Sequence, residues 1–396
     1  MGAFNGQLRS NEIFASLYNM IISQEVFADN IKGTFSSLVD KGRVDGSLYG
    51  DTKLYYAVDV LKSSPWGNDA EATNLLALHR PPAPDVQAIH LDIFRQISLT
   101  VDNYLSKRAW GDEYAFSQFN SVMLGMIRET KRVYDSTIYN SFIGTAESSA
   151  TKGIVNIDIT TATTGVTDKE SVARIEAQTI AQGIADLFIG LRDITRDYND
   201  YGNLRSVNEE DLVVVWNSKW VNKITKIDLP TIFHKDGLMD KFEEEVLPYR
   251  YFGDLLDATL ATASVYDAST NPTGMFTKAG NNYTIVNTGS TAYKVKSLIE
   301  TDYTVSSVVT HVFPGDTIPV GAVLTITSST VPFAYLENAD KICVVMHKRS
   351  VPYMSAFEVG TSFFNQKSLT ENHYLTFGHN TLEYLKNYPF IVVKKI

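Results

Sequence analysis

The chain has 396 residues and a mass of 44.1 kDa. This is longer than a chain that usually folds around a single hydrophobic core, so two or three lobes are expected. Its hydrophobic share of 44% and charged share of 20% are typical of globular proteins and exclude a disordered chain. The formal net charge of -10 argues against a protein whose main task is to grip nucleic acid through a basic patch.

The sequence offers no sign of a membrane anchor or a disulfide. No run of about 18 uncharged apolar residues is present, so no transmembrane helix is predicted, and the start MGAFNGQLRS lacks the basic-then-apolar layout of a signal peptide. The single cysteine, Cys343, lies in the alternating apolar run KICVVMH. We expect it to be a small buried hydrophobe of a strand rather than a reactive thiol.

The first elements in chain order are a helix and an arm. Apolar residues at helical spacing predict an amphipathic helix within residues 8–30. Residues 44–61 and 86–101 then alternate as strands do, and the stretch between them is rich in Pro, Gly and polar residues. This pattern predicts a long extended hairpin. An isolated pair of strands is only marginally stable in water. Such an arm must therefore pack against the rest of its own chain or against a neighbouring subunit.

Two long helices follow the arm. An apolar stripe over residues 116–146, with Asp112 as a possible N-cap, predicts a helix roughly 45 Å long. Residues 153–166 read as strand or loop. Thr167 and Glu170 then form a capping box before a second apolar stripe, which predicts a helix over residues 167–198.

The rest of the chain mixes strands, short helices and a β-rich segment. The run LVVVW at 212–216 predicts a central strand, and a short helix is expected from Lys219 to about Ile227. The segment DGLMDKFEEEVL can be another helix, which would place Glu243 to Glu245 on a solvated face. Thr, Ser, Val, Gly and Asn dominate residues 263–335 and predict an inserted small β domain. Four further strands are expected: 340–348, 356–364, 373–380 and 389–395.

Motifs for catalysis and cofactor binding are missing from the sequence. It contains no phosphate-binding glycine loop, no zinc-type spacing of His and Cys and no GxSxG elbow. The stretch DYNDYGN begins like a calcium loop but lacks the bidentate Glu, so we interpret it as a helix-ending turn. His373 and His379 are either a catalytic pair or, as we favour, polar positions on a half-buried sheet edge. We therefore predict no enzyme and no catalytic, cofactor or metal site.

The succession of elements resembles the major capsid proteins of tailed bacteriophages, which have the Hong Kong 97 capsid fold. The resemblance rests on the N-terminal helix, the extended loop at 45–100, the long spine helix at 113–147, the second helix ending in DYNDYGNLRSVNEEDLVVVWNSKWVNKI, and the terminal strands beginning at ENADKICVVMHKRSVPYMSAFEVGTSFFNQ. It implies an α+β fold. The inserted β region is similar to accessory domains of some short-tailed phage coats.

The resemblance also implies a division of the chain. In that family an A domain fills the centre of a hexamer or pentamer, a P domain carries the spine helix, and the extended loop (E-loop) laps over the adjacent subunit. The last strands are then expected to close the sheet of the P domain. The implied parts are an N-terminal arm at 1–44, the E-loop at 45–100, the P domain at 101–164 and 371–396, the A domain at 165–262 and 336–370, and the inserted β domain at 263–335.

The implied function is that of a major head protein that self-assembles into the icosahedral shell around the phage double-stranded DNA genome. Expected partners are further copies of the chain in hexamers and pentamers, a scaffolding protein, a portal protein and the packaged DNA by non-specific contact, with no membrane. The expected location is the virion, assembled in the cytoplasm of the bacterial host. Because the chain starts at Met1 with an immediate helix, we expect either a separate scaffolding protein or none.

Within the arm, a small set of residues is expected to contact the neighbouring subunit: Lys53, Lys62, Pro65, Trp66, Asn68 and Asp69. Some family members form a covalent bond between a lysine and an asparagine, but nothing around the two arm lysines indicates one here, so we expect none.

Three other classes of protein remain as alternatives. A cellular encapsulin-type compartment shares the fold and is the nearest, although the β insertion favours a phage coat. A hydrolase would leave the arm, the strut-like helix and the insertion unexplained. A tail-tube or adhesin protein would have more β structure and fewer long helices.

Overall fold

The computed structural model describes residues 37–45, 52–63, 80–102, 113–225, 243–256, 276–285, 294–325 and 333–396. The helix expected within residues 8–30 and the proposed cap Asp112 lie outside these residues.

A five-stranded sheet in the order β4-β18-β15-β5-β6 forms the centre of the body. Its strands are β4 (Ile154–Ile157), β5 (Leu212–Asn217), β6 (Glu243–Leu247), β15 (Lys341–His347) and β18 (Phe390–Lys395). Every residue of β5 is buried, as predicted for a central strand, because helices cover both faces. Alternate β5 side chains pack against α7 (Lys169–Arg192) on one face and against α5 (Glu113–Thr145) on the other.

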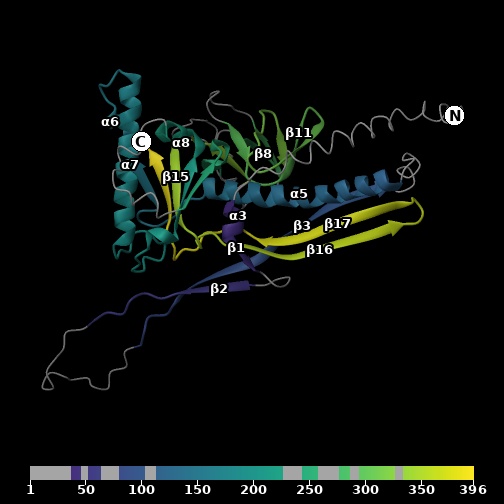
Figure 1. Ribbon diagram of the computed structural model, residues 1–396, viewed down its shortest axis with the longest axis horizontal. Coiled ribbons are helices and arrows are strands. Elements are labelled where there is room, and N and C mark those ends of the chain that lie inside the picture. Colours follow the sequence, from purple (N-terminus) through teal and green to yellow (C-terminus); the bar gives the residue numbers. More distant parts are fainter. Residues whose placement is uncertain are drawn as a thin grey trace.

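The long helix α5 is the helix predicted from the apolar stripe over residues 116–146. Its 33 residues span about 50 Å, and it runs beside a second sheet whose order is β1-β16-β17-β3-β2 (Figure 1). That sheet, the arm sheet, consists of β1 (Arg43–Asp45), β2 (Thr52–Ala57), β3 (Asp85–Asp102), β16 (Tyr353–Asn365) and β17 (Thr370–Asn380). The short helix α3 (Ser37–Gly42) leads into β1 and packs against α5.

The β-rich segment forms its own antiparallel sheet on the other side of α5 from the arm sheet (Figure 1). Its strands, in the order β12-β11-β13-β9-β8, are β8 (Phe276–Ala279), β9 (Asn282–Ile285), β11 (Thr301–Val305), β12 (Val308–Val312) and β13 (Val323–Thr325). Gly280, with a positive φ of 62°, makes the tight turn between β8 and β9. A separate apolar cluster that includes Tyr283, Leu324 and Phe333 fills this sheet's interior.

A three-stranded sheet in the order β10-β14-β7 joins the β-rich segment to the body. Its strands are β7 (Gly253–Leu256), β10 (Val295–Ser297) and β14 (Ala334–Glu337). The remaining short elements are α6 (Ile159–Ala162), α8 (Ser218–Thr225), η1 (Glu209–Asp211) and η2 (Tyr249–Tyr251).

Two local predictions were wrong. The second long helix begins at Lys169, two residues after the predicted cap Thr167, because Asp168 is the cap and its carboxylate accepts the Ser171 N–H at 2.9 Å. The helix ends at Arg192 instead of 198. Glu243 to Glu245 lie on strand β6, parallel to β5, and not on a helix. On a strand, Glu243 and Glu245 point to the same side, where Lys41 pairs with both at 2.6 and 2.8 Å.

The terminal strands also differ from the prediction. They do not close one sheet together: β17 lies between β16 and β3 in the arm sheet, whereas β18 lies between β4 and β15 in the central sheet. The predicted hairpin is also shorter than expected. Residues 52–57 of β2 pair with residues 85–90 of β3. The second half of β3 pairs with β17 and extends beyond the end of β2.

Candidate subunit-contact surfaces

The arm begins at the β2–β3 hairpin and leaves the body as extended chain. Residues 58–63 and 80–84 project beyond the hairpin, away from the sheets (Figure 1). Apolar side chains along it are not covered by the rest of the chain, and Leu61 and Tyr56 are 68% and 64% exposed. In the described part of the arm, the other exposed large apolar residues are Leu54, Val58, Val60 and Val86. A contiguous exposed apolar surface of this kind is typical of a protein interface.

The predicted contact residues are divided by the described range. Lys53 lies half-buried on β2, and Lys62 is exposed on the projecting chain. Pro65, Trp66, Asn68 and Asp69 lie outside the described residues. The sequence pattern therefore located the arm. It did not identify Val58, Val60 and Leu61 as contact candidates, because their exposure depends on how the body of the protein folds.

The root of the arm is fastened to the turn that follows α7. The Asp59 carboxylate accepts the Leu204 N–H at 3.0 Å and pairs with Arg196 at 2.6 Å. Arg205 donates to the Val58 carbonyl at 2.7 Å. On the returning strand, the Asn203 amide donates to Asp85 at 3.2 Å. The turn DYNDYGN and the residues on either side of it thus hold the arm at its base, whereas Val60 and Leu61 just beyond are exposed.

The pKa of the Asp59 carboxyl is lowered to about 2, first by the Leu204 N–H and then by Arg196. Because the folded-state pKa is lowered, this anchor stabilises the docked arm above the usual carboxyl range and is lost as the pH falls towards about 2. We expect Asp59→Ala to raise the hydrogen-exchange rate of the Leu204 amide several-fold at neutral pH, measured by mass spectrometry or NMR. Wild-type protein is expected to lose the same protection only on acidification through that range.

A matched control is Asp193→Ala, because the Asp193 carboxylate accepts the adjacent Ile194 N–H and has no hydrogen bond or ion pair with the described part of the arm. It should leave the Leu204 exchange rate unchanged. Equal rates in wild type and Asp59→Ala would show that the turn does not hold the arm.

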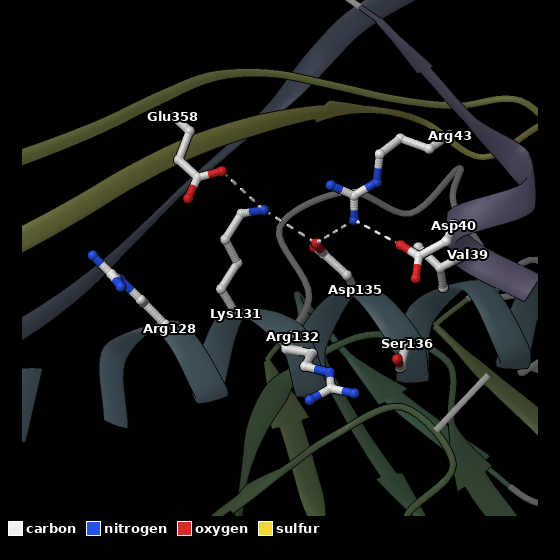
Figure 2. Close-up of a pocket in the computed structure, with 9 residues that line it drawn as sticks. All are labelled: Val39, Asp40, Arg43, Arg128, Lys131, Arg132, Asp135, Ser136 and Glu358. Carbon is white, nitrogen blue, oxygen red and sulfur yellow. Dashed lines mark hydrogen bonds and ion pairs between the residues drawn. The ribbon is translucent and has the colours of Figure 1, made fainter. Parts of the chain in front are cut away.

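A chain of alternating charges fixes the arm sheet to α5 (Figure 2). Lys131 on α5 pairs with Asp135 at 3.1 Å and with Glu358 of β16 at 3.3 Å. Asp135 in turn lies 3.9 Å from Arg43 of β1 and accepts the Tyr353 hydroxyl at 2.6 Å. Lys131 and Asp135 are buried, so these pairs define how the sheet sits on the helix.

Beside this network lies a cavity of about 330 Å³. Its lining holds four basic side chains, Arg43, Arg128, Lys131 and Arg132, and three acidic ones, Asp40, Asp135 and Glu358. Figure 2 shows Lys131, Asp135 and Arg43 pointing toward one another, whereas Arg128 and Arg132 point away on either side. The lining is therefore organised around internal ion pairs rather than around a common centre.

The two histidines of β17 do not lie on a sheet edge, because β17 is an interior strand that continues through Gly378 to Asn380. Six residues of extended strand, roughly 20 Å, separate them, so they do not lie side by side as a pair. His379 is fully buried. Its Nδ1 contacts the Asn380 carbonyl at 2.8 Å and its Nε2 contacts the Tyr134 hydroxyl at 2.7 Å, while burial lowers its pKa. A neutral ring that donates through Nδ1 and accepts through Nε2 satisfies both contacts. His373 is half-buried beside Glu371 at 3.8 Å.

Other features of the described residues carry structural roles. Cys343 is buried in the central sheet, as predicted, and burial raises the pKa of its thiol. In the described ranges, no three His, Cys, Asp or Glu side chains come together as metal ligands would. No helix in the part of the chain that the structure describes is long and apolar enough to cross a membrane.

Comparison with solved structures finds phage capsids. The capsid structure of Staphylococcus phage Andhra is similar over 92% of this chain and 84% of that chain, with a TM-score of 0.54 and 10% sequence identity. A structure of native bacteriophage P68 described by its head fibre and inner core protein gp22 matches over 90% and 83%, with a TM-score of 0.49 and 11% identity. The mature capsid of bacteriophage PhiM1 matches over 91% and 88%, with a TM-score of 0.45 and 9% identity.

The likeness to the Andhra capsid confirms the predicted phage-capsid fold of the Hong Kong 97 type. Comparison of the sequence with curated proteins gives no match. A family model, described as that of the Phi29-like phage major capsid protein, matches residues 4–394 and does not favour the encapsulin alternative. The chain therefore belongs to the Phi29-like phage major capsid protein family.

Proposed function

We propose that the apolar arm of this phage major capsid protein laps over an adjacent copy in the shell. The protein is a structural component of the virion that assembles with copies of itself. The observation that carries the proposal is the contrast along the arm: Asp59 and Asp85 tie its root to the body, while Leu61 just beyond is 68% exposed. A fastened root with a bare apolar continuation suits a strap that binds outside its own subunit.

Burial of this surface gives the shell its lateral cohesion. Standard protein interfaces bury roughly 1,600 Å² in total, and each copy in a closed shell makes several of them. Modest contacts therefore add up around hexamers and pentamers. Opposed strand surfaces and apolar side chains contribute without any covalent bond between subunits.

The proposed division of the chain follows the sheets. The N-terminal arm at 1–44, the E-loop at 45–100 and the β insertion at 263–335 keep the boundaries expected from the sequence. The P domain holds α5 with the arm-sheet strands β16 and β17, which continue the sheet that β3 of the E-loop begins. The A domain holds α7 and the central sheet, and we place β18 in it because β18 pairs with β15.

Further partners are proposed from the role of a major capsid protein. A separate scaffolding protein guides assembly in the host cytoplasm, and a portal protein occupies one vertex. Double-stranded DNA meets the inner face without sequence reading, and the net charge of -10 is tolerable there because counterions neutralise most of the DNA charge.

Negative-stain electron microscopy of the purified protein tests the function. Closed icosahedral shells, formed with or without a co-expressed scaffold, are the expected result. Rods would indicate a tube protein, and small discrete particles under every assembly condition would contradict the proposal.

A further inference from the structure

One long edge of the arm sheet has no partner strand. On one side, β16 pairs with β17 along its length, from Ser355 to Asn365. On the other side, β1 covers only Tyr353 to Ser355. Among the described residues, the outer backbone edge of β16 beyond Ser355 therefore lacks a ladder, and its side chains from Glu358 to Phe364 are exposed.

This edge also lacks the usual protection against strand pairing. Natural proteins protect exposed edges with charged side chains, proline or bulges. Between Glu358 and Lys367 the sequence VGTSFFNQ has no charge and no proline, and the register is regular from Val359 onward. The opposite edge of the same sheet is formed by β2, which carries Lys53, and by the second half of β3, which carries Asp92, Arg95 and Asp102. Among the described strands of this sheet, β16 thus has the longest stretch of edge without a charge or a proline.

We infer that β16 pairs antiparallel with β16 of a second copy about a two-fold axis perpendicular to the arm sheet, so that two subunits share one continuous sheet. The inference rests on the capsid function, since a closed shell brings identical surfaces together across two-fold axes. It does not depend on where the arm docks.

The side chains of the edge define the register of this pairing. Phe377 of β17 packs on Tyr134 of α5, so its side chain lies on the face of the sheet that contacts α5. The β17 residues opposite Val359, Thr361 and Phe363 lie on the other face, because side chains alternate along a strand. These three β16 side chains therefore lie on the face that points away from α5. A two-fold axis perpendicular to the sheet keeps each face of the sheet on the same side in both copies. Directly opposite residues must therefore lie on the same face, which requires the axis to pass between the two copies of one residue.

An axis at Thr361 pairs Val359 of each copy with the second copy's Phe363. Aromatic with β-branched and Thr with Thr are favourable cross-strand pairs. Val359 and Phe363 are 40% and 64% exposed in the single chain, and both would be covered. No like charges meet, because Glu358 is already paired with Lys131 at 3.3 Å.

The base of β16 is rigid enough to present such an edge. The charge chain from Glu358 through Lys131 and Asp135 holds the strand against α5 (Figure 2). The Tyr353 hydroxyl adds a buried hydrogen bond to Asp135 at 2.6 Å. A strand positioned in this way loses little conformational freedom when a second strand adds to it.

Cysteine crosslinking of assembled shells tests the pairing. Thr361→Cys places two thiols directly opposite each other, within the distance that a disulfide requires. Oxidation or a short thiol crosslinker should convert the shell protein to dimers on a denaturing gel, with no larger ladder, because an isologous contact closes at two copies.

The controls use the two flanking positions. With the axis at Thr361, two copies of a residue at 359 or at 363 lie four residues apart along the ladder, roughly 13 Å. Val359→Cys and Phe363→Cys alone should therefore give about tenfold less dimer than Thr361→Cys, whereas the double variant Val359→Cys/Phe363→Cys should crosslink as well as Thr361→Cys does.

Three outcomes would overturn the inference. The first is intact shells of Thr361→Cys that remain monomeric on oxidation. The second is equal crosslinking by both single flanking variants. The third is crosslinking of Thr361→Cys to a cysteine placed at Val60 of the arm, which would make the arm the occupant of this edge. Failure of the capsid function itself would appear differently, as the absence of shells from wild-type protein.

Discussion

Shell assembly is expected to be abolished when Leu61 is replaced by aspartate, while the subunit stays folded. Leu61 is 68% exposed, so a charge there does not disturb the core of the single chain. In the shell the same side chain would be covered by a neighbour, where a leucine contributes about 2 kcal/mol and an unpaired carboxylate costs several kcal/mol. The penalty recurs at every copy, so we expect at least a tenfold loss of sedimenting shells.

The control for this variant is Leu61→Met, which keeps the side chain apolar and of similar volume. It should assemble at close to the wild-type yield. Circular dichroism and gel filtration of the unassembled protein report whether the aspartate variant is folded. A wild-type yield of shells from Leu61→Asp would show that the arm does not bury this side chain against another copy.

The largest stability effect is expected at the ion cluster between the central sheet and the end of α5. Lys341 is fully buried, and its Nζ lies 2.9 Å from Glu147 and 3.4 Å from Asp254. Lys394 lies 2.7 Å from the same Glu147 oxygen and 3.5 Å from Asp254. Burial alone would raise the pKa of Asp254, but the two lysines lower it below its usual value, so the carboxylate is ionised in the folded protein.

Removing the anions should cost far more than removing the buried cation. The double variant Glu147→Gln/Asp254→Asn leaves Lys341 charged and without an ionic partner in the interior, and we expect a loss of about 3–5 kcal/mol in the free energy of unfolding. Lys341→Met removes the buried charge, while Lys394 still pairs with both partly exposed carboxylates, so the loss in the free energy of unfolding should stay below about 2 kcal/mol.

Chemical denaturation of the unassembled subunit checks both variants. If Lys341→Met proved as destabilising as the double variant, the lysine would act through packing or through its 2.7 Å bond to the Gly253 carbonyl rather than as a charge.

The elements that the sequence predicted well are those with strong periodicity. The apolar stripe of α5 predicted its helix to within a few residues, and the continuous run LVVVW predicted a strand covered on both faces. The breaker-rich segment after residue 263 predicted a separate β region, which appears as a five-stranded sheet over 276–325. Each of these signals is local, so a single chain segment contains all of it.

The predictions that failed depended on contacts between distant segments. The alternation of β3 is the same along its whole length, and nothing in it shows that one half pairs with β2 and the other with β17. The Glu243 to Glu245 run fits a solvated helix face as well as a strand. The strand is favoured by distant partners, which are the neighbouring strand β5 and the side chain of Lys41, some 200 residues earlier in the chain. The sequence around His379 also does not show its contact with the Tyr134 hydroxyl, 245 residues away in the chain.

The candidate interfaces were predictable only in part. The arm was located by its position between two strands, but the exposure of Tyr56 and Leu61 follows from what the body leaves uncovered. The free edge of β16 could not be predicted, because an edge is defined by which strands fail to pair with it.

A cryo-electron microscopy reconstruction of the assembled shell tests the central claim, that the arm finds its missing cover on another copy. We expect density for residues 58–63 against the adjacent subunit, with Leu61 and Tyr56 enclosed at that contact. A closed shell in which the arm of every copy lies on its own subunit, or extends into solvent with these side chains bare, would contradict it.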